Sequence, residues 1–340
     1  MVIFAPRRYG KSSLIWRVRQ ELVKRKVLVA QVDLMTTPTK ERLAEKLAKA
    51  IHEEIASALF RAKDRLQVFS GLRITPTITV DPQDGSVGFG FAAGRRSEDV
   101  DATLERLLQL PARLAAERNR RVALVLDEFQ EIVEIDPHLP RLLRSTFQEQ
   151  PDVAHVYLGS KRHMMERIFN DRNEPFWRSA KQVELGVIAP PLFRTHIERQ
   201  FQRTGRTMDP GVPDALLAVT RGHPYATQEL CYFLWEETPD GEEAGPGRLD
   251  AALEDVLRSE NAHFDLIWDR AAKGQRLVLQ ALAAERGRPL SGGYRSRHGL
   301  PGPSSVQRAL EALTREELVL RENGEYRIAE PFLAEWLATR

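Results

Sequence analysis

The chain has almost no cysteine, no excess of charge of one sign and no long hydrophobic run, and each absence excludes a class of protein. Cys231 is the only cysteine, which excludes a disulfide framework and a cysteine metal cluster and is typical of a reducing compartment. Fifty basic residues against 48 acidic ones give a net charge of +2, so no global field favours nucleic acid or membrane, although a local patch remains compatible with either. No apolar run approaches the roughly 20 residues of a membrane span, and the N-terminus has no signal-peptide pattern. We therefore expect a cytoplasmic protein without a membrane partner.

The first fourteen residues, MVIFAPRRYGKSSL, predict a phosphate-binding loop between a buried strand at residues 2–4 and a helix. This order aims backbone N–H groups and the positive end of the helix dipole at one small volume, which favours a polyphosphate. Lys11 is placed to reach the β- and γ-phosphates of ATP, and Ser12 to put its hydroxyl on a bridging Mg²⁺ ion. The residues expected to line the nucleotide are Pro6, Arg7, Arg8, Tyr9, Gly10, Lys11, Ser12 and Ser13. The residues expected on the inward face of the helix are Leu14, Ile15, Val18 and Leu22.

Ala5 departs from the usual pattern of such loops, which have glycine at this position. Alanine disfavours positive φ, so Ala5 must have an ordinary backbone conformation or carry mild strain. The alternative to a phosphate-binding loop is a chance Gly-Lys-Ser sequence before a helix. The strand before the motif and the helix after it make this alternative the weaker one.

Two further apolar segments predict strands of a parallel sheet. Residues 26–34, KVLVAQVDL, precede a helix that Thr39 can cap, and VALVLDEF, residues 122–129, ends in two carboxylates. Carboxylates after an apolar run are costly unless a cation or water lies there, and in an open parallel sheet that end is the ligand crevice. We expect Asp127 to hold Mg²⁺, usually through water, and Glu128 to polarise the attacking water. The alternative is an Asp-Glu pair that caps a helix after a core strand.

A third core strand, residues 153–158, ends in the polar segment GSKRH. Ser160 is placed to sense the γ-phosphate or the attacking water, and Arg162 to reach the phosphates, although serine and glycine also end strands in general. Arg178 lies in PFWRSA, residues 175–180, before a strand-like QVEL. It could act as an arginine finger for a neighbouring subunit or pack structurally among the aromatic residues, and the sequence favours neither role.

Residues 68–92 interrupt the alternation of strands and helices with two β-rich runs around DPQDG, which predicts an inserted hairpin at about 68–95. Such a hairpin could touch a partner or nucleic acid. An ornament at the sheet edge is favoured, because Arg73 is the only charge in its first arm. A helix should then start at Ser97 and run toward Asn119. Its inward residues should be Val100, Leu104, Leu107 and Leu108.

From Pro190 the composition turns helical, and no strand signal follows until residue 318. The tripeptide GHP, residues 222–224, lies between two helices, and Pro224 presets the start of the second. From Lys273 the pattern is a helix, a Gly-rich loop to Gly302, a helix and a hairpin with an Asn-Gly turn. This order describes a winged helix-turn-helix.

Charge does not decide whether the winged helix binds DNA. The arginines of its expected reading helix, Arg308 and Arg315, are offset by glutamates at 311, 316 and 317. Basic residues in the preceding loop favour DNA, namely Arg295, Arg297 and His298. The alternative is a winged helix that packs against a neighbouring domain.

These motifs together resemble the prokaryotic ATPases of the AAA+ and STAND group, which are most abundant in archaea and related to the origin-recognition Cdc6 proteins. The resemblance covers nearly the whole chain and rests on PRRYGKSSL, VLDEFQE, YLGSKRHMMERIF, PFWRSA, GHPYATQELC and SSVQRALEAL with its wing. The chain departs from the family in Ala5 and in lacking the usual segment before the first strand, which ends in an arginine-glutamate pair and helps to enclose adenine.

The resemblance implies that Lys11 and Ser12 are the Walker A residues and that Asp127 and Glu128 are Walker B. It implies that Ser160 is the sensor on the third core strand. It further implies that the GHP tripeptide forms a lid motif on the adenine side of the nucleotide, through His223 and Pro224.

The predicted fold is an α/β P-loop parallel sheet with an inserted hairpin, then an α-helical lid and a winged helix. The predicted domains are residues 1–187, 188–272 and 273–340. The predicted function is a Mg²⁺-dependent switch that binds ATP and hydrolyses it slowly, so that nucleotide state controls the lid and winged helix. The alternative is a DNA-binding or scaffolding protein with structurally bound ADP and negligible turnover. The expected partners are nucleotide, together with DNA or a protein, a second copy included.

Overall fold

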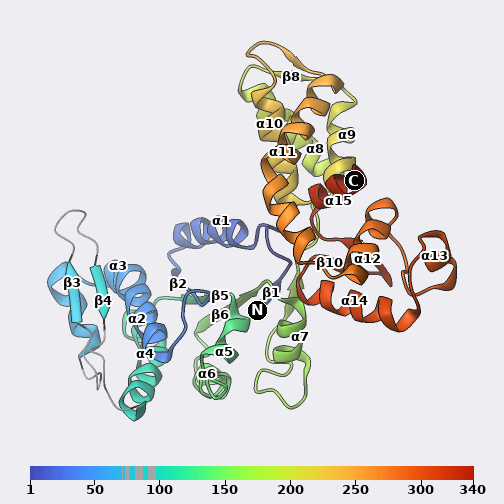
Figure 1. Ribbon diagram of the computed structural model, residues 1–340. Helices are drawn as coiled ribbons and strands as arrows, with labels where there is room; N and C mark the ends of the chain where they lie inside the picture. Colours follow the sequence, from blue (N-terminus) through green and yellow to red (C-terminus); the bar gives the residue numbers. More distant parts are fainter. Residues whose placement is uncertain (71, 73–76, 81–86, 91–96) are drawn as a thin grey trace. The chain divides into compact units, whose positions relative to one another are not determined.

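The structure, a computed structural model, describes residues 1–70, 72, 77–80, 87–90 and 97–340 (Figure 1). The chain divides into two compact units, Met1–Leu185 and Gly186–Arg340. Within the second unit, the helical and winged-helix segments share one hydrophobic cluster. The division into three domains at residues 187 and 272 therefore stays a proposal. None of the helices described is long and apolar enough to cross a membrane.

The first unit is built on a five-stranded sheet of order β2-β5-β6-β1-β7, in which all neighbours are parallel. Its strands are β1 Val2–Phe4, β2 Leu28–Asp33, β5 Val122–Asp127, β6 Val153–Gly159 and β7 Gln182–Glu184. The short strand β1 lies between β6 and β7, with Ile3 opposite Leu158 and Val183. The loop after β1 therefore leaves from the interior of the carboxyl edge, beside the end of β6.

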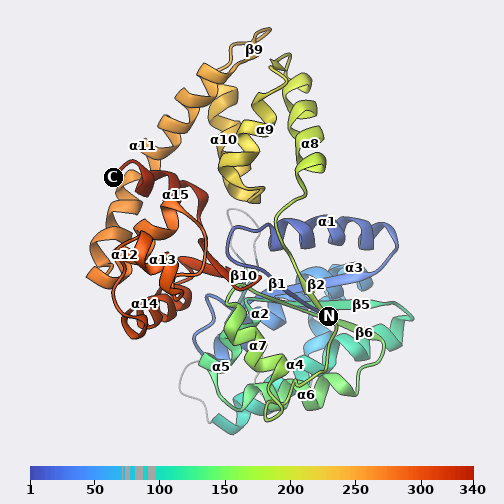
Figure 2. The same ribbon diagram turned by 90° about the vertical axis from the view of Figure 1, so that its right-hand side faces the viewer.

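Successive side chains of each strand point to opposite faces of the sheet, and the apolar cluster on one face is much larger than that on the other. Val2 and Phe4 belong to the larger core, whereas Ile3 belongs to a small cluster on the other face. Helix α1 lies on the small cluster, and α2, α4 and α6 lie on the opposite face (Figure 2). The helices of this unit are α1 Lys11–Lys24, α2 Lys40–Ala50, the π-helix η1 Ile51–Ala56, α3 Ser57–Leu59, the 3-10 helix η2 Ala62–Phe69, α4 Ser97–Arg118, the 3-10 helix η3 Phe129–Glu131, α5 Ile132–Ile135, α6 Leu139–Gln148 and α7 Arg162–Asn170.

Helix α1 departs from the predicted burial pattern. Ile15 is buried and Leu22 is partly buried, but Leu14 and Val18 expose 37% and 40% of their surface. The apolar cluster under α1 contacts one stripe of the helix, which contains Ile15 and Leu22. Leu14 and Val18 were therefore wrongly assigned to the inward face.

The predicted hairpin and the helix after it are present. Strands β3 Thr77–Val80 and β4 Val87–Gly90 pair antiparallel. Arg73 and the turn at residues 81–86 lie outside the described residues. Helix α4 starts at Ser97 and ends at Arg118. Its four residues predicted to face inward, Val100, Leu104, Leu107 and Leu108, are all buried.

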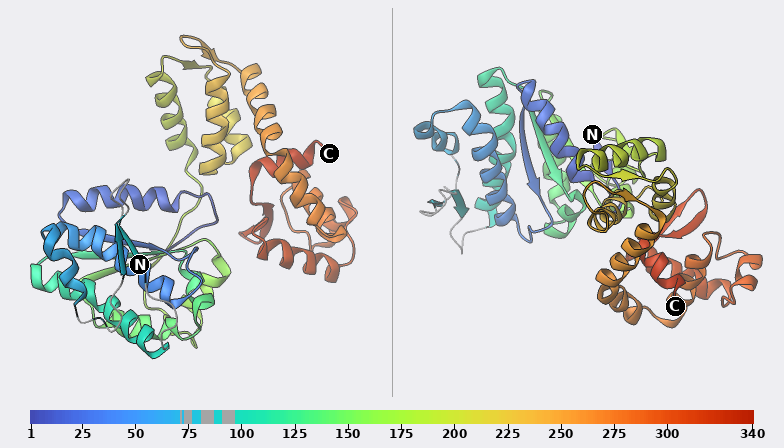
Figure 3. Two further views of the ribbon diagram at one scale, coloured as in Figure 1. Left: turned by 60° about the vertical axis from the view of Figure 1, so that its left-hand side comes forward. Right: turned by 90° about the horizontal axis from the view of Figure 1, so that it is seen from above.

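The second unit is helical up to a winged helix. Its first part contains α8 Pro190–Arg203, β8 Thr207–Met208, α9 Val212–Thr220, α10 Pro224–Glu236, β9 Glu243–Ala244 and α11 Pro246–Arg270. Its last part contains α12 Lys273–Ala284, α13 Gly292–Arg297, α14 Pro303–Arg315, β10 Val319–Glu322, β11 Glu325–Ile328 and α15 Pro331–Ala338. The long helix α11 packs against α10 and leads into α12 (Figure 3). The predicted winged helix is thus confirmed.

Four elements of this unit were not predicted. Strands β8 and β9 form a two-residue parallel pair, too short to leave a sequence signal. Helix α13 lies in the segment predicted as a Gly-rich loop, because Tyr294 is buried there and its hydroxyl donates to the carbonyl oxygen of Ala281 at 2.9 Å. Ser291 caps this helix. Helix α15 closes the chain and buries Phe332 and Trp336.

Candidate nucleotide-binding site

The loop between β1 and α1 has a backbone suited to enclosing phosphate. Arg8 and Gly10 both adopt positive φ, at 65° and 82°. A Cβ atom at Gly10 would meet nothing within 4 Å, so the backbone angle and not a lack of space favours glycine there. No side chain caps the start of α1. A phosphate group is the kind of ligand that the N–H groups of such a first turn bind.

Lys11 is drawn into this loop. Its side chain is buried, with 6% exposed, and its Nζ donates to the carbonyl oxygens of Ala5 and Pro6 at 2.9 and 3.1 Å. Ala5 does not have positive φ, so the ordinary conformation expected of it is confirmed. The N–H of Ala5 donates to the carbonyl oxygen of Gly159 at 3.3 Å, which ties the loop to the end of β6. In the rest of the loop Tyr9 is buried, Pro6 is half-buried, and Arg7, Arg8, Ser12 and Ser13 are exposed.

Asp127 is the last residue of β5 and exposes only 8% of its surface. Its Oδ1 accepts from the N–H of Glu128 at 3.0 Å, and its Oδ2 from Nε2 of Gln31 at 3.4 Å. Burial raises the pKa of Asp127, although the positive charge of Lys11 acts in the opposite direction. A carboxylate that burial penalises in this way is one that a bound cation would stabilise.

Glu128 follows with a left-handed backbone, φ 51°, that turns its side chain toward β6. Its Oε2 accepts from the hydroxyl of Ser160 at 2.6 Å and from Nε2 of Gln130 at 2.5 Å. Burial acts to raise the pKa of Glu128, but these two hydrogen bonds, together with the charge of Lys11, hold that pKa below its usual value. The structure thus brings Ser160 to Glu128, and it moves the pKa values of two adjacent carboxyl groups in opposite directions.

Gln130 is the residue that sequence reasoning missed. Its side chain is fully buried, and its Nε2 lies 2.5 Å from Glu128, 3.3 Å from Oε1 of Glu131 and 3.5 Å from Oγ of Ser160. Its Oε1 has no hydrogen-bond partner among the described residues. Phe129 anchors this turn, with its ring 4.6 Å from that of Tyr157. The one feature of the sequence that could have indicated a role for Gln130 is its position in VLDEFQE, just after the strand. A glutamine after a strand is too common to indicate such a role by itself.

We expect Gln130→Ala to slow any reaction that depends on Glu128 by about 10- to 150-fold, since one hydrogen bond to a charged group is worth about 1.5–3 kcal/mol. Losing a donor to the ionised carboxylate raises its pKa, so the acid limb of the pH–rate profile should shift to higher pH. Gln150→Ala is a matched control, because Gln150 is also buried and donates to the carbonyl oxygen of Leu108 at 2.9 Å. A pH–rate profile with the same acid limb in both variants would contradict a positioning role.

The two arginines singled out in the sequence are both exposed. The guanidinium of Arg162 donates to Glu166 at 2.8 Å and to Glu184 at 2.5 Å, so it reaches a phosphate only by leaving these carboxylates. Arg178 lies over the ring of its neighbour Trp177, 5.4 Å from the centroid, and its own φ is 50°. The stack on Trp177 is compatible with a packing role and the exposed guanidinium with an arginine finger, so both roles stay predictions.

The GHP tripeptide lies in the second unit. Gly222 has φ 69°, and a Cβ there would lie 2.7 Å from the carbonyl oxygen of Ile188, which explains the glycine. His223 is buried and its Nδ1 accepts from the N–H of Ala226 at 3.2 Å, which caps α10. Pro224 occupies the first turn of that helix, as predicted. The contact of His223 and Pro224 with adenine stays a prediction.

The oxygen ligands near the loop fit a Mg²⁺ ion that is bound jointly by the protein and the phosphates, and not an ion held by protein side chains alone. No group of three or more His, Cys, Asp or Glu side chains that could hold a metal occurs in the described part of the chain. Mg²⁺ commonly takes one or two protein oxygens and completes its shell with phosphate oxygens and water. Asp127 and the exposed hydroxyl of Ser12 are the residues that would hold it here.

Asp127→Asn should remove the Mg²⁺-dependent part of ATP affinity without lowering the melting temperature. Its folded-state pKa is raised, so its charge costs stability at neutral pH, and this cost disappears as pH falls through that pKa. Asp33→Asn is a matched control, because Asp33 ends β2 directly opposite Asp127 but is exposed. Calorimetry with and without Mg²⁺ checks this, and equal wild-type affinities under both conditions would refute it.

The basic residues before the reading helix are partly neutralised. Arg297 and His298 both contact Glu285, at 3.0 and 3.1 Å, and Arg295 is half-buried. On α14 itself, Nε2 of Gln307 donates to Glu311 at 2.7 Å. DNA binding by the winged helix stays a prediction.

Comparison with known proteins agrees with this geometry. Residues 1–167 match the family described as an AAA domain, and residues 262–339 match a probable winged helix domain. The Walker-type ATPase PABY2304 of Pyrococcus abyssi is 18% identical, with a TM-score of 0.65 over 99% of this chain and 90% of that chain. The Aeropyrum pernix ORC2 protein, in its ADPNP–ADP complexes, is 15% identical, with a TM-score of 0.56 over 99% of this chain and 86% of that one.

Among curated proteins, no sequence matches this chain. The two solved structures are distant in sequence and show a common fold. The AAA match covers the strands that carry the loop, Asp127 and Ser160, and the second match covers the wing. The chain therefore contains an AAA domain at residues 1–167 and a C-terminal winged helix domain at residues 262–339.

Proposed function

We propose that the protein binds Mg²⁺·ATP at the loop of Lys11 and hydrolyses it slowly, as a molecular switch. The observation that carries the proposal is the pair of hydrogen bonds that Glu128 accepts from Ser160 and Gln130. Ser160 and Gln130 keep this carboxylate ionised and oriented at the carboxyl edge of the sheet, beside Lys11 and Asp127. An ionised carboxylate fixed there can accept a proton from water at neutral pH.

The reaction is attack of water on the γ-phosphorus, which breaks its bond to the β–γ bridging oxygen and yields ADP and inorganic phosphate. Glu128 orients the water and takes up its proton. Lys11 leaves the carbonyl oxygens of Ala5 and Pro6 to bind the β- and γ-phosphate oxygens. Asp127 and Ser12 would hold Mg²⁺, which would supply positive charge to offset that of the phosphates. Arg162 can take part only after its contacts with Glu166 and Glu184 break.

The switch is proposed from the division of the chain into two units joined near Leu185. ATP would favour one arrangement of the units and ADP another, through the GHP tripeptide of the second unit. Dyes at Glu41→Cys on α2 and Glu254→Cys on α11, with Cys231→Ser, report the distance between units, since both glutamates are exposed. We expect energy transfer in ATP-bound Glu128→Gln to differ from that in the ADP-bound protein. Equal transfer in both states would contradict the switch and favour static nucleotide binding.

Arg178 offers a test of assembly. An arginine finger supplied to a neighbouring subunit can be worth about 10³ or more in turnover. Because Arg178 is exposed, Arg178→Ala should keep ATP affinity and melting temperature but lose ATPase activity. Mixing it with Lys11→Ala should restore part of the activity, since one protein supplies the loop and the other the finger. Arg172→Ala, exposed in the same segment, is the control. No gain on mixing, with activity strictly proportional to protein concentration, argues for a monomer.

A further inference from the structure

Two basic runs that are far apart in the sequence meet at the amino edge of the sheet, at the opposite end from the loop of Lys11. KRK, residues 24–26, precedes β2, and RNRR, residues 118–121, precedes β5. These strands are parallel neighbours, with Leu28 opposite Val122. Nη2 and Nε of Arg120 donate to the carbonyl oxygen of Lys26 at 2.8 and 3.1 Å. We call this cluster the basic edge, and its members are Lys24, Arg25, Lys26, Arg118, Arg120 and Arg121.

The charges of the basic edge are mostly not neutralised. Lys24 contacts Glu21 at 2.7 Å, and it is the one member with a carboxylate within 4 Å in the described part of the chain. The guanidinium of Arg118 lies over the ring of Phe60, 4.3 Å from its centroid. Apart from the half-buried Arg120, all members are exposed. A net charge of only +2 for the whole chain therefore conceals a local cluster of six basic residues.

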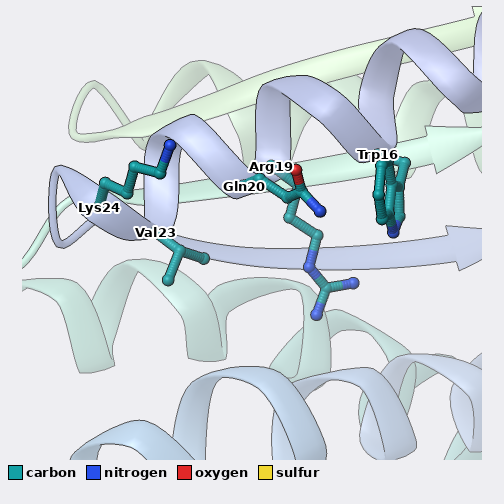
Figure 4. Close-up of a pocket in the computed structure, with 5 residues that line it drawn as sticks. All are labelled: Trp16, Arg19, Gln20, Val23 and Lys24. Atoms are coloured by element: carbon teal, nitrogen blue, oxygen red, sulfur yellow. The ribbon is translucent and has the colours of Figure 1, made fainter. Parts of the chain in front are cut away.

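A groove with an exposed aromatic ring continues this surface along α1. Trp16 exposes 62% of its surface and Val23 60%. They line a pocket of about 410 Å³ together with Arg19, Gln20 and Lys24, the last of which also belongs to the basic edge. Figure 4 shows Trp16, Arg19 and Val23 projecting from the same side of the helix. Eight residues separate Trp16 from Lys24, which is about 12 Å along an α-helix.

The position of the apolar side chains on α1 distinguishes between partners. A helix that binds a membrane turns its apolar face outward. On α1 the face opposite the buried Ile15 and Leu22 carries Ser13, Arg17 and Lys24, all exposed and polar. Trp16 and Val23 lie on a flank, in the groove. A helix that binds a membrane would carry such side chains on its outer face, which is polar here, so this flank fits a strand that runs along the helix better than a bilayer.

We propose that the basic edge and the Trp16 groove bind single-stranded nucleic acid. A phosphodiester strand carries regularly spaced negative charges, which match a row of cations that face few carboxylates. An unpaired base can stack on an exposed indole, which is how proteins hold single strands without reading their sequence. The residues of this surface belong neither to the nucleotide site nor to the winged helix, so the proposal does not rest on ATP hydrolysis.

Fluorescence anisotropy with a labelled oligothymidylate about 20 nucleotides long tests the proposal over a range of salt concentrations. The logarithm of the binding constant should fall with the logarithm of salt, by about 0.7 per phosphate contacted. The combined variant Arg25→Gln, Lys26→Gln and Arg121→Gln removes three contacts. It should flatten the slope by about 2 and weaken binding at least about tenfold at low salt. Trp16→Ala should weaken binding about tenfold or more and leave the slope unchanged.

The controls separate this surface from others. Arg199→Gln, Arg203→Gln and Arg258→Gln remove the same charge from exposed positions of the second unit and should have no comparable effect. The proposal is overturned if the basic-edge variant binds like the wild type, or if only Arg308→Gln with Arg315→Gln on α14 reduces binding. It is also overturned if phosphatidylserine vesicles or polyglutamate displace the oligonucleotide as well as unlabelled oligothymidylate does. Circular dichroism checks that each variant is folded. Trp16→Ala provides a second test of the surface that leaves the charge of the protein unchanged.

Discussion

Replacing Lys11 with alanine should reduce ATP affinity by about 100-fold or more. Lys11 is the cation that the loop places on the phosphates, and hydrogen bonds between charged groups are worth about 1.5–3 kcal/mol each. Its Nζ already lies inside the loop, on the carbonyl oxygens of Ala5 and Pro6, so little reorganisation is needed to meet a phosphate. Isothermal titration calorimetry measures the loss directly.

Two measurements guard this result against a folding artefact. Lys24→Ala removes the same charge from the other end of the same helix, where the side chain is exposed and paired only with Glu21. Its ATP affinity should equal that of the wild type. The melting temperature of Lys11→Ala without nucleotide checks that the variant is folded, because the carbonyl oxygens of Ala5 and Pro6 lose a donor. Unchanged ATP affinity in a folded Lys11→Ala protein would show that the loop is not the phosphate site.

Replacing Glu128 with glutamine should abolish turnover, by about 10²–10⁴-fold, while ATP affinity remains. Glutamine has almost the same shape and can still accept from Ser160, but it cannot take up the proton of the attacking water. Passage of the protein through a desalting column after incubation with labelled ATP distinguishes the two states. Glu128→Gln should retain ATP, whereas the wild type should retain ADP. Recovery of ADP from both would mean that another group acts as the base.

The pH dependence follows from the two neighbouring carboxyl groups. The base form of Glu128 exists above its pKa, which is held below the usual value, so turnover should not lose this base near neutral pH. Asp127 has a raised pKa and accepts a proton first as pH falls. Mg²⁺-dependent affinity should therefore decline at a higher pH than the base function of Glu128 does.

The sequence predicted the parts of the site that lie at strand ends. Parallel strands end at one edge, so apolar runs that finish in Asp127 and in Ser160 had to bring these residues close to the loop of Lys11. It could not predict the contacts of long side chains. Arg162 was expected to point at phosphates, but its guanidinium donates to Glu184 instead. Glu184 lies on β7, 22 residues further along the chain, and no local sequence pattern shows that the two residues meet. Gln130 was missed although its partner Glu128 is only two residues away, because a glutamine after a strand is too common to indicate a role.

Errors in the fold have equally local causes. Leu14 and Val18 fit a helical apolar stripe, but the cluster under α1 contacts the stripe of Ile15 and Leu22 and leaves them exposed. Glycines around residue 292 predicted a loop, yet a single buried ring, that of Tyr294, and the Ser291 cap fix a helix there. In both cases the local sequence preference was identified correctly, but tertiary packing determined the structure.

Steady-state phosphate release by the wild-type protein, measured with ATP in the presence and absence of Mg²⁺, tests the central claim most directly. We expect slow, Mg²⁺-dependent release that falls to background in Lys11→Ala, in which binding is lost, and in Glu128→Gln, in which ATP stays bound. Release from the wild type that equals the background of both variants would contradict hydrolysis at this site and leave a protein that binds nucleotide without consuming it.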